Sequence, residues 1–187
     1  MGRQRLVLTA GMGPASPSHT YLLAGGSEMA LFIKFDGVDG EANDKDHKSW
    51  SDLLSFSWGL HKAGAGATGQ TRRRGVVTVE DVMIMKEFDK SSPKLAEAVC
   101  TGKVFPKVEL HDTATYGEGR ATFLKYELKN VMVSSHSISA AGGGDAVPTE
   151  SMSLNFEEVK QTYSEYDAKG GKKGNVEFSW KVEEGTK

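Results

Sequence analysis

The sequence lacks the features that several classes of protein require. It has one cysteine, Cys100, in 187 residues, which excludes an internal disulfide framework and a metal site built from several cysteines. No apolar run approaches the ~18 residues that a membrane-spanning helix needs. The 23 basic residues nearly balance the 25 acidic ones. A net charge of −2 therefore gives no general reason to expect nucleic acid or a membrane surface as a partner.

A secretory signal peptide is also missing from the N-terminus. The apolar run Leu6-Val7-Leu8 is interrupted at once by Thr9 and Gly11, whereas a signal peptide needs an apolar core of roughly 7–15 residues. The Pro, Ser and Gly content of residues 1–28 predicts a flexible leader, either an upstream extension or a cloning remnant. An apolar strand begins at Met29, so we expect one folded domain over residues 29–187.

Short apolar-polar alternations, separated by glycine-rich turns, dominate the rest of the chain. They predict strands in the ranges 30–35, 53–60, 76–85, 104–112, 120–138, 152–163 and 176–182, with His61 and Lys62 beginning an exposed loop. Ser92 followed by Pro93, with Gly102 at the far end, predicts one short helix. The fold class expected is mainly β, an antiparallel β-barrel or sandwich of two sheets with one flanking helix and a long extended loop.

The alternation also predicts which side chains face the core. The inward residues of the predicted strands and helix include Leu54, Phe56, Trp58, Leu60, Leu124, Tyr126, Leu128, Met132, Met152, Leu154, Phe156, Leu95, Val99 and Cys100. Ser55 and Ser57 face the opposite way. The segment 76–85 is apolar on both faces and should be covered on both. The apolar phase changes near Glu157-Glu158, which predicts a β-bulge there.

Several sequence features suggest a chemical site, but none has the neighbouring residues or spacing that the chemistry would need. Gly64, Gly66 and Gly69 spell G-x-G-x-x-G, but a strand rather than a phosphate-binding helix follows. Ser57 lies outside a nucleophile elbow, and Cys100 is expected to be buried and inert. The five histidines (19, 47, 61, 111 and 136) lack metal-ligand spacing. We therefore predict no catalytic, cofactor-binding or metal-binding residues.

The loop between the second and third strands carries Arg72, Arg73 and Arg74. Three basic residues without interleaved aromatics, in a net acidic chain, are typical of a solvated or protein-contacting loop rather than a nucleic-acid site. A flexible basic loop on a rigid sheet therefore favours contact with another protein.

From Met29 onward the chain resembles the Hcp (haemolysin-coregulated protein) family of type VI secretion tail-tube proteins. The resemblance rests on ordered blocks across residues 29–183. They are ALFIK with DGVDGE (30–34 and 36–41), SFSWG (55–59), KEFDKSSP (86–93), VMVSSHS (131–137), GGGD (142–145), ESMSLNF (150–156) and DAKGG (167–171).

The resemblance implies a structural protein without catalytic activity. Hexameric rings would stack into a tube that is assembled in the bacterial cytoplasm and then secreted. The implied partners are a spike protein, a contractile sheath and effector proteins carried in the lumen, with no nucleic acid and no membrane insertion. The ring-stacking loop would comprise His61, Lys62, Gly64, Gly66, Gly69, Arg72, Arg73 and Arg74, and the lumen lining would include Ser55 and Ser57. The alternatives are a small-ligand-binding β-barrel or an effector-dedicated chaperone that assembles no tube.

Overall fold

The computed structural model describes residues 29–62, 77–117, 119–143 and 147–182. The leader predicted for residues 1–28 lies outside the described residues. Within the described ranges the chain forms one helix and eleven strands, which confirms the predicted mainly-β class. These elements are β1 (Met29–Phe35), β2 (Ser51–Leu53), β3 (Ser55–Ser57), β4 (Leu60–Lys62), β5 (Val77–Val79), β6 (Val82–Glu87), α1 (Ser92–Thr101), β7 (Val104–Tyr116), β8 (Gly119–Ser139), β9 (Thr149–Asn155), β10 (Glu158–Tyr166) and β11 (Lys172–Lys181).

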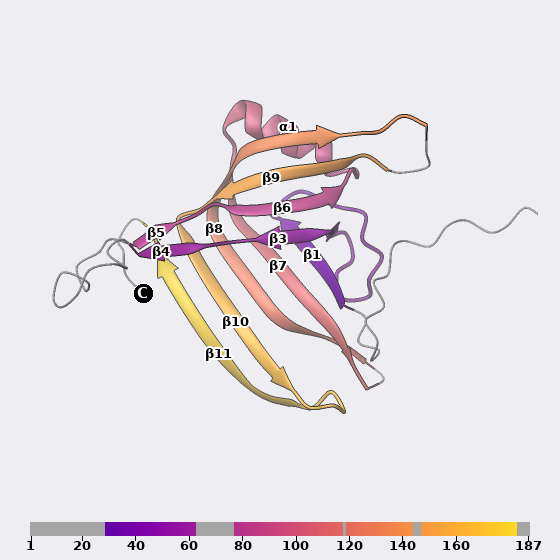
Figure 1. The fold of residues 1–187 in the computed structure, drawn as a ribbon, viewed down its shortest axis with the longest axis vertical. Coiled ribbons are helices and arrows are strands. Elements are labelled where there is room, and N and C mark those ends of the chain that lie inside the picture. The colour runs from indigo at the N-terminus through magenta and orange to yellow at the C-terminus, as the bar shows by residue number, and fades with distance from the viewer. Residues whose placement is uncertain (1–28, 63–76, 118, 144–146, 183–187) are drawn as a thin grey trace, which may run out of the picture.

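The strands form an antiparallel sheet that curls back on itself. Its order is β2-β1-β7-β8-β9-β6-β3, and β10 joins it by pairing with both β8 and β11. A single residue, Leu54, separates β2 from β3, so the two ends of this order meet in the chain itself. Leu54 donates its backbone N–H to the carbonyl of Met85, 2.8 Å away. The sheet therefore curls into a barrel whose end strands, β2 and β3, are joined through the chain and are not paired with each other, with α1 at one end (Figure 1).

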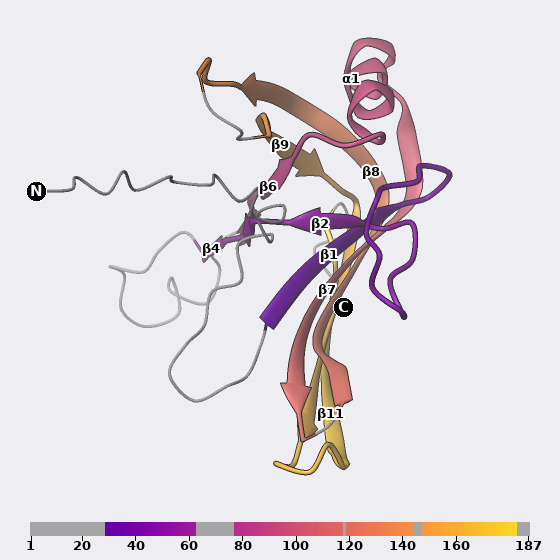
Figure 2. The same ribbon diagram turned by 90° about the vertical axis from the view of Figure 1, so that its right-hand side faces the viewer.

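Four strands continue beyond the barrel, and we call β7, β8, β10 and β11 in this region the extension. It runs away from the barrel at the end opposite α1 and forms a single layer (Figure 2). β8 is 21 residues long and belongs to both parts. It pairs with β9 over Met132–Ser139 and with β10 over Leu124–Lys129.

The barrel and the extension meet at a line where three neighbouring strands change phase together. Phe105 and Val108 on β7 are both buried, as are Leu128 and Val131 on β8. Phe156 and Val159, on either side of the β9–β10 junction, are likewise both buried. The two residues of each pair are three positions apart in the sequence. Side chains of a regular strand point alternately to its two faces, so this alternation must shift between the two residues. Asn130 lies in the middle of this line with a positive φ of 49°.

The phase change predicted near Glu157-Glu158 is present, but the predicted bulge is wrong. The pairs Met132–Asn155 and Lys129–Glu158 keep one register along β8, so no extra residue is inserted. The chain instead breaks between β9 and β10, where Glu157 donates its N–H to the carbonyl of Lys129 at 3.1 Å. Met132 was predicted to face inward but is exposed, because the same phase shift turns its side chain outward.

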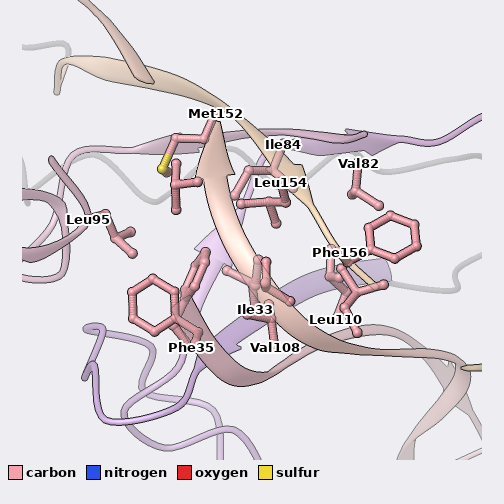
Figure 3. Packing of buried hydrophobic residues seen from close by; sticks show 14 of the residues in the cluster. Ile33, Phe35, Val82, Ile84, Leu95, Val108, Leu110, Met152, Leu154 and Phe156 are labelled. Carbon is pink, nitrogen blue, oxygen red and sulfur yellow. The ribbon is translucent and has the colours of Figure 1, made fainter. Parts of the chain in front are cut away.

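Apolar side chains from the barrel strands and from α1 meet in one core (Figure 3). Leu128, Met152, Leu154 and Phe156 are buried as predicted. The helix is also confirmed, with proline in its first turn and Gly102 in the left-handed conformation (φ 66°) at its end. Its inward stripe is Leu95 and Ala98, whereas Cys100 is exposed, contrary to prediction. Five residues at 100° each place position 100 about 140° round the helix from position 95.

The predicted strand over 76–85 divides into β5 and β6, and its predicted cover on both faces is wrong. Val82 and Ile84 are buried in the core, whereas Met83 and Met85 are exposed. Leu54 is also exposed rather than inward, because the phase changes between β2 and β3. Phe56 and Trp58 face inward as predicted and are half-buried against the core.

Candidate assembly surfaces

Serine and methionine side chains cover the outward face of β3, β6, β9 and the part of β8 that pairs with β9. Strand pairing places Ser55, Met85, Ser151 and Ser137 in one row across the four strands. Ser57, Met83, Ser153 and Ser135 form the next row. We call these eight residues the hydroxyl face. None of these eight residues is ionisable, and the next outward residue of β6 beyond Met85 is the exposed Glu87.

Hydrogen bonds join neighbouring strands within the second row of the hydroxyl face. The Ser153 hydroxyl donates to the Met83 sulfur at 2.9 Å, and the Ser135 hydroxyl donates to Ser153 Oγ at 2.7 Å. At its margin Asp81 accepts hydrogen bonds from Ser134 (2.7 Å) and Asn155 (2.9 Å). Its carboxylate is thereby occupied by the protein's own donors.

The predicted residues Ser55 and Ser57 are exposed on this face. Sequence reasoning missed the other six members, because each becomes part of the face only when strands distant in sequence pair. One usable signal was the alternation of Ser151 and Ser153 with buried Met152 and Leu154. Met83 and Met85 were predicted to lie on a strand covered on both faces, so they were not recognised as surface residues.

A small two-stranded sheet forms the base of the predicted ring-stacking loop. β4 pairs with β5 through Leu60–Val79, His61–Thr78 and Lys62–Val77. His61 and Lys62 are exposed, as predicted. Leu60, predicted to face inward, is exposed as well, because β4 leaves the barrel to pair with β5. The remaining predicted loop residues, Gly64, Gly66, Gly69, Arg72, Arg73 and Arg74, lie outside the described residues.

Glu80 fixes the start of this hairpin against the barrel. Trp58 Nε1–H donates to the Glu80 carbonyl at 3.0 Å, and His61 Nε2 lies 2.7 Å from Glu80 Oε1. A Cβ atom on Gly59 would lie 2.3 Å from Glu80 Oε2. Glycine at 59 therefore allows the glutamate to approach the backbone where the strand turns out into the hairpin.

A buried ionic network ties β6, β9 and the start of α1 together. Lys86 is fully buried, with its Nζ 2.7 Å from Glu150 Oε1 and 2.8 Å from Asp89 Oδ1. Ser92 donates its hydroxyl to Glu150 Oε1 at 2.7 Å rather than capping the helix, and Ser91 occupies the N-cap position. His136 Nε2 lies 2.7 Å from Glu150 Oε2. These contacts satisfy the buried charges, so the network holds the helix to the sheet.

The lowered pKa of Asp89 shows that this network stabilises the ionised form of its carboxylate. Burial by itself raises the pKa of Asp89, but hydrogen bonds from Lys86, Ser91 and Ser51 outweigh burial and lower that pKa below its ordinary value. The carboxylate therefore stays ionised inside the protein, as a structural ion pair needs.

A second polar cluster attaches the loop after β1 to β7. The His47 ring stacks on Phe32, with centroids 4.3 Å apart, and its Nδ1 lies 2.8 Å from Asp44 Oδ1. His47 Nε2 lies 2.9 Å from Nδ1 of His111. Burial, together with the electrostatic influence of His47 and Lys125, lowers the pKa of His111 to about 4.

Asp112, the next residue on β7, is perturbed in the opposite direction. Burial raises the pKa of Asp112 to about 6. Its Oδ1 and the Nε2 of His111 are buried without a hydrogen-bond partner among the described residues. Neither polar cluster gathers three or more His, Cys, Asp or Glu ligands in a metal-binding arrangement within the described ranges. No helix in the described part of the chain is long and apolar enough to cross a membrane.

Comparisons with known proteins agree on one family. The family model described as "Type VI secretion system effector, Hcp" matches residues 32–163. Protein hcp1 of Pseudomonas aeruginosa (strain PAO1) is 36% identical over 153 residues, which cover 81% of this chain and 94% of that protein.

Solved structures are similar over most of the chain as well. One, described as a type six secretion system protein, has a TM-score of 0.79 at 31% identity and covers 84% of this chain and 98% of its own. Hcp1 from Salmonella typhimurium has a TM-score of 0.67 at 25% identity, covering 84% and 97%.

Proposed function

Because this chain belongs to the Hcp family of type VI secretion proteins, we propose that it is a structural subunit of the secretion tube. Six copies form a ring, rings stack into a tube, and the tube is exported. The hydroxyl face carries this proposal. It spans four paired strands, is exposed except at the half-buried Ser151 and Ser153, and consists of serine and methionine side chains, which suits the wall of a channel through which proteins pass.

In this assignment Ser55 and Ser57 line the lumen together with Met83 and Met85. Methionine side chains are flexible and polarizable, so they adapt to partners of different shape. Effector proteins are the proposed cargo. A spike protein and a contractile sheath are the other proposed partners, and assembly takes place in the cytoplasm before export. The protein is proposed to have no catalytic activity.

The β4–β5 hairpin supports a role in ring stacking for the loop that follows it. His61 and Lys62 lie on a small sheet that leaves the barrel, so the residues between Lys62 and Val77 begin and end away from the core. We assign Gly64, Gly66, Gly69, Arg72, Arg73 and Arg74 to the contact with the next ring. A head-to-tail contact of this kind propagates as a filament.

The alternative of a small-ligand-binding barrel is less well supported. Side chains of the core, among them Ile33, Val108, Leu110 and Leu154, fill the barrel interior (Figure 3). The described barrel thus has a packed centre in place of a ligand cavity.

Size-exclusion chromatography with light scattering, followed by negative-stain imaging, tests the proposal. We expect a mass of six subunits and ring-shaped particles with a central hole. A protein that stays monomeric at every concentration and forms no particles would contradict it, and would favour the binding-barrel or chaperone alternative.

A further inference from the structure

The buried ring of His47 holds a surface segment against the outer side of the sheet. Phe32 points away from the core, because its neighbours Leu31 and Ile33 pack into the core cluster, yet Phe32 is only 2% exposed. His47 covers it. The two rings are stacked, with centroids 4.3 Å apart and planes at 4°, and His47 is itself 3% exposed. We call residues 43–50, which carry His47, the latch segment.

The partners of His47 fix where the hydrogens of the histidine pair lie. Burial raises the pKa of Asp44, but hydrogen bonds from donors that include His47 and Arg120 outweigh burial and lower that pKa. The ionised carboxylate can only accept, so the Nδ1 of His47, 2.8 Å from Asp44 Oδ1, carries the hydrogen. His47 Nε2 is then an acceptor, and His111 Nδ1–H donates to it at 2.9 Å. The Nε2 of His111 is left without a hydrogen.

This arrangement has no satisfied position for a further proton. A proton taken up by His111 lies on its Nε2. A proton taken up by His47 lies on Nε2 of that ring, so His111 must accept with Nδ1 and carry its own hydrogen on Nε2. Both arrangements place an N–H at His111 Nε2, which is buried without a hydrogen-bond partner among the described residues. A buried donor without a partner is costly, so the closed segment disfavours the protonated pair.

The charged groups around the pair nearly balance. The titratable side chains that face it are Asp44 on the segment, Asp52 on β2, Lys34 on β1, Glu109 on β7, and Arg120, Lys125 and Glu127 on β8. The carboxylates favour an added positive charge and the cations oppose it. The unpaired N–H at His111 Nε2 therefore decides the outcome. Burial, the largest influence on His111, acts in the same direction and lowers its pKa to about 4.

We propose that His47 and His111 form an acid-sensitive latch: when the pair takes up a proton, the latch segment leaves the sheet while the barrel stays folded. The other contacts of the segment include those of Asp44 with Arg120 and of the Ser49 carbonyl with Lys34, both at 3.0 Å and made by partly exposed side chains. Such a segment can open locally. Once it opens, water accepts the hydrogen on either ring. The inference does not depend on the proposed assembly.

Hydrogen–deuterium exchange with mass spectrometry tests the latch on the full chain at pH 7 and at pH 4.5. The lower pH lies between the folded pKa of His111, about 4, and its ordinary value of 6.5, so proton uptake there favours the open segment. We expect the protection of peptides covering residues 43–50, corrected for the intrinsic exchange rate, to fall by at least about tenfold relative to peptides from β8 and β9.

His111→Gln separates the latch from general acid sensitivity. A glutamine amide can turn over, donating to neutral His47 or accepting from protonated His47, so it satisfies both states. We expect this variant to keep the segment protected at pH 4.5. His61→Gln is the matched control, because His61 is an exposed histidine that is paired with Glu80 on another hairpin. It should lose protection of the segment as the parent does.

Three results would overturn the inference. The first is a parent whose segment keeps its protection at pH 4.5. The second is a loss of protection that is equal in the segment and in β8 and β9, since the whole domain then opens. The third is a segment that opens equally in His111→Gln. If that variant does not fold, the histidine ring resonances of the parent decide by NMR: a segment that opens outside the pH range in which His47 or His111 titrates contradicts the latch, and coincident transitions support it.

Discussion

At the scale of single residues, the most consequential side chain is the buried Lys86. It has no exposed surface, and two carboxylates, on Asp89 and Glu150, lie within 2.8 Å of its Nζ. Breaking a buried ion pair is costly because the partner charges remain buried and uncompensated. Lys86 thus links β6 to both β9 and the start of α1 through charge rather than through apolar packing.

We predict that Lys86→Met lowers the free energy of unfolding by about 3–5 kcal/mol, measured by urea denaturation at one protein concentration. Lys129→Met is the matched control. Lys129 is paired with Glu158 at 2.7 Å but is 54% exposed, and exposed pairs contribute at most about 1 kcal/mol. Equal midpoints for Lys86→Met and the parent would show that the network contributes little.

His111 and Asp112 oppose one another in their effect on stability against pH. The pKa of His111 is about 4 in the folded protein and its ordinary value is 6.5, so its contribution is lost as the pH falls from about 6.5 to 4. The pKa of Asp112 is about 6 against an ordinary 3.8, so its contribution is complete below 3.8 and is lost as the pH rises through 6. Between pH 4 and 6 the two contributions offset each other.

Asp112→Asn removes one side of this balance. We expect a higher melting temperature than the parent at pH 7, because an ionised carboxylate is no longer buried. We also expect a steeper loss of stability on acidification from pH 6.5 to 4, because the His111 contribution is then unopposed. Melting temperatures measured at half-unit pH intervals test this. A profile parallel to that of the parent would mean that Asp112 is not ionised in a buried site at neutral pH.

At the scale of elements, Pro106, Asn130 and Glu157 lie along the line where the barrel meets the extension. The strands change phase at this line, so their buried side differs between the two parts of the molecule. Asn130 has a φ of 49°, and its side-chain amide donates to Glu157 Oε2 at 2.5 Å. Asparagine tolerates the left-handed region better than most residues, and β-branched residues tolerate it least. A residue of that kind here would resist the phase change.

We predict that Asn130→Val destabilises the protein by about 1–2 kcal/mol more than Asn130→Gly. Both variants lose the hydrogen bond to Glu157, so the difference between them isolates the backbone conformation. Unfolding midpoints in urea provide the measurement. If the two variants are equally stable, the positive φ of Asn130 is not required for the bend.

The sequence alone identified most elements but not the breaks between them. Alternation revealed the strands, and the proline and glycine signals revealed α1, because both reflect local chemistry. The inward assignments failed at Leu54, Leu60, Cys100 and Met132. Leu54 and Met132 lie next to points where the chain changes pairing partner or phase, which depend on contacts distant in sequence. Lys86 and Glu150 were missed because charged residues give no apolar signal even when they are fully buried.

At the scale of the whole molecule, the structure separates its surfaces by chemistry. The hydroxyl face is uncharged, and one face of the extension carries the ion pairs of Lys125 and Lys129. The other face carries Leu124, Tyr163 and Val176 beside the polar Asp112 and Gln161. The candidate lumen residues Ser55 and Ser57 could be found from sequence because they alternate with Phe56. Met83 and Met85 could not, because their exposure depends on which side of the strand remains uncovered.

We predict that changing Arg72, Arg73 and Arg74 together to Glu leaves ring mass unchanged while ring stacking and export fall. The reason is that reversing three charges in the assigned stacking loop opposes contact with the next ring without altering the barrel. Electron microscopy measures tube length, and the amount of protein in culture supernatant measures export. The same three residues changed to Lys keep the charge and serve as control. Loss of the ring in the Glu variant would mean that the loop acts within the ring.

The pairing of β1 with β7 has a consequence for the order of folding. β1 and β2 come early in the chain, yet Phe35 pairs with Val108, and β1 finds no other long partner than β7. Contacts of such large sequence separation form late, because the intervening chain must first be brought together. During synthesis we therefore expect β1 to stay unpaired with β7 until the residues up to Ala114 have emerged from the ribosome. A chaperone that binds nascent apolar strands would find its target in residues 29–57.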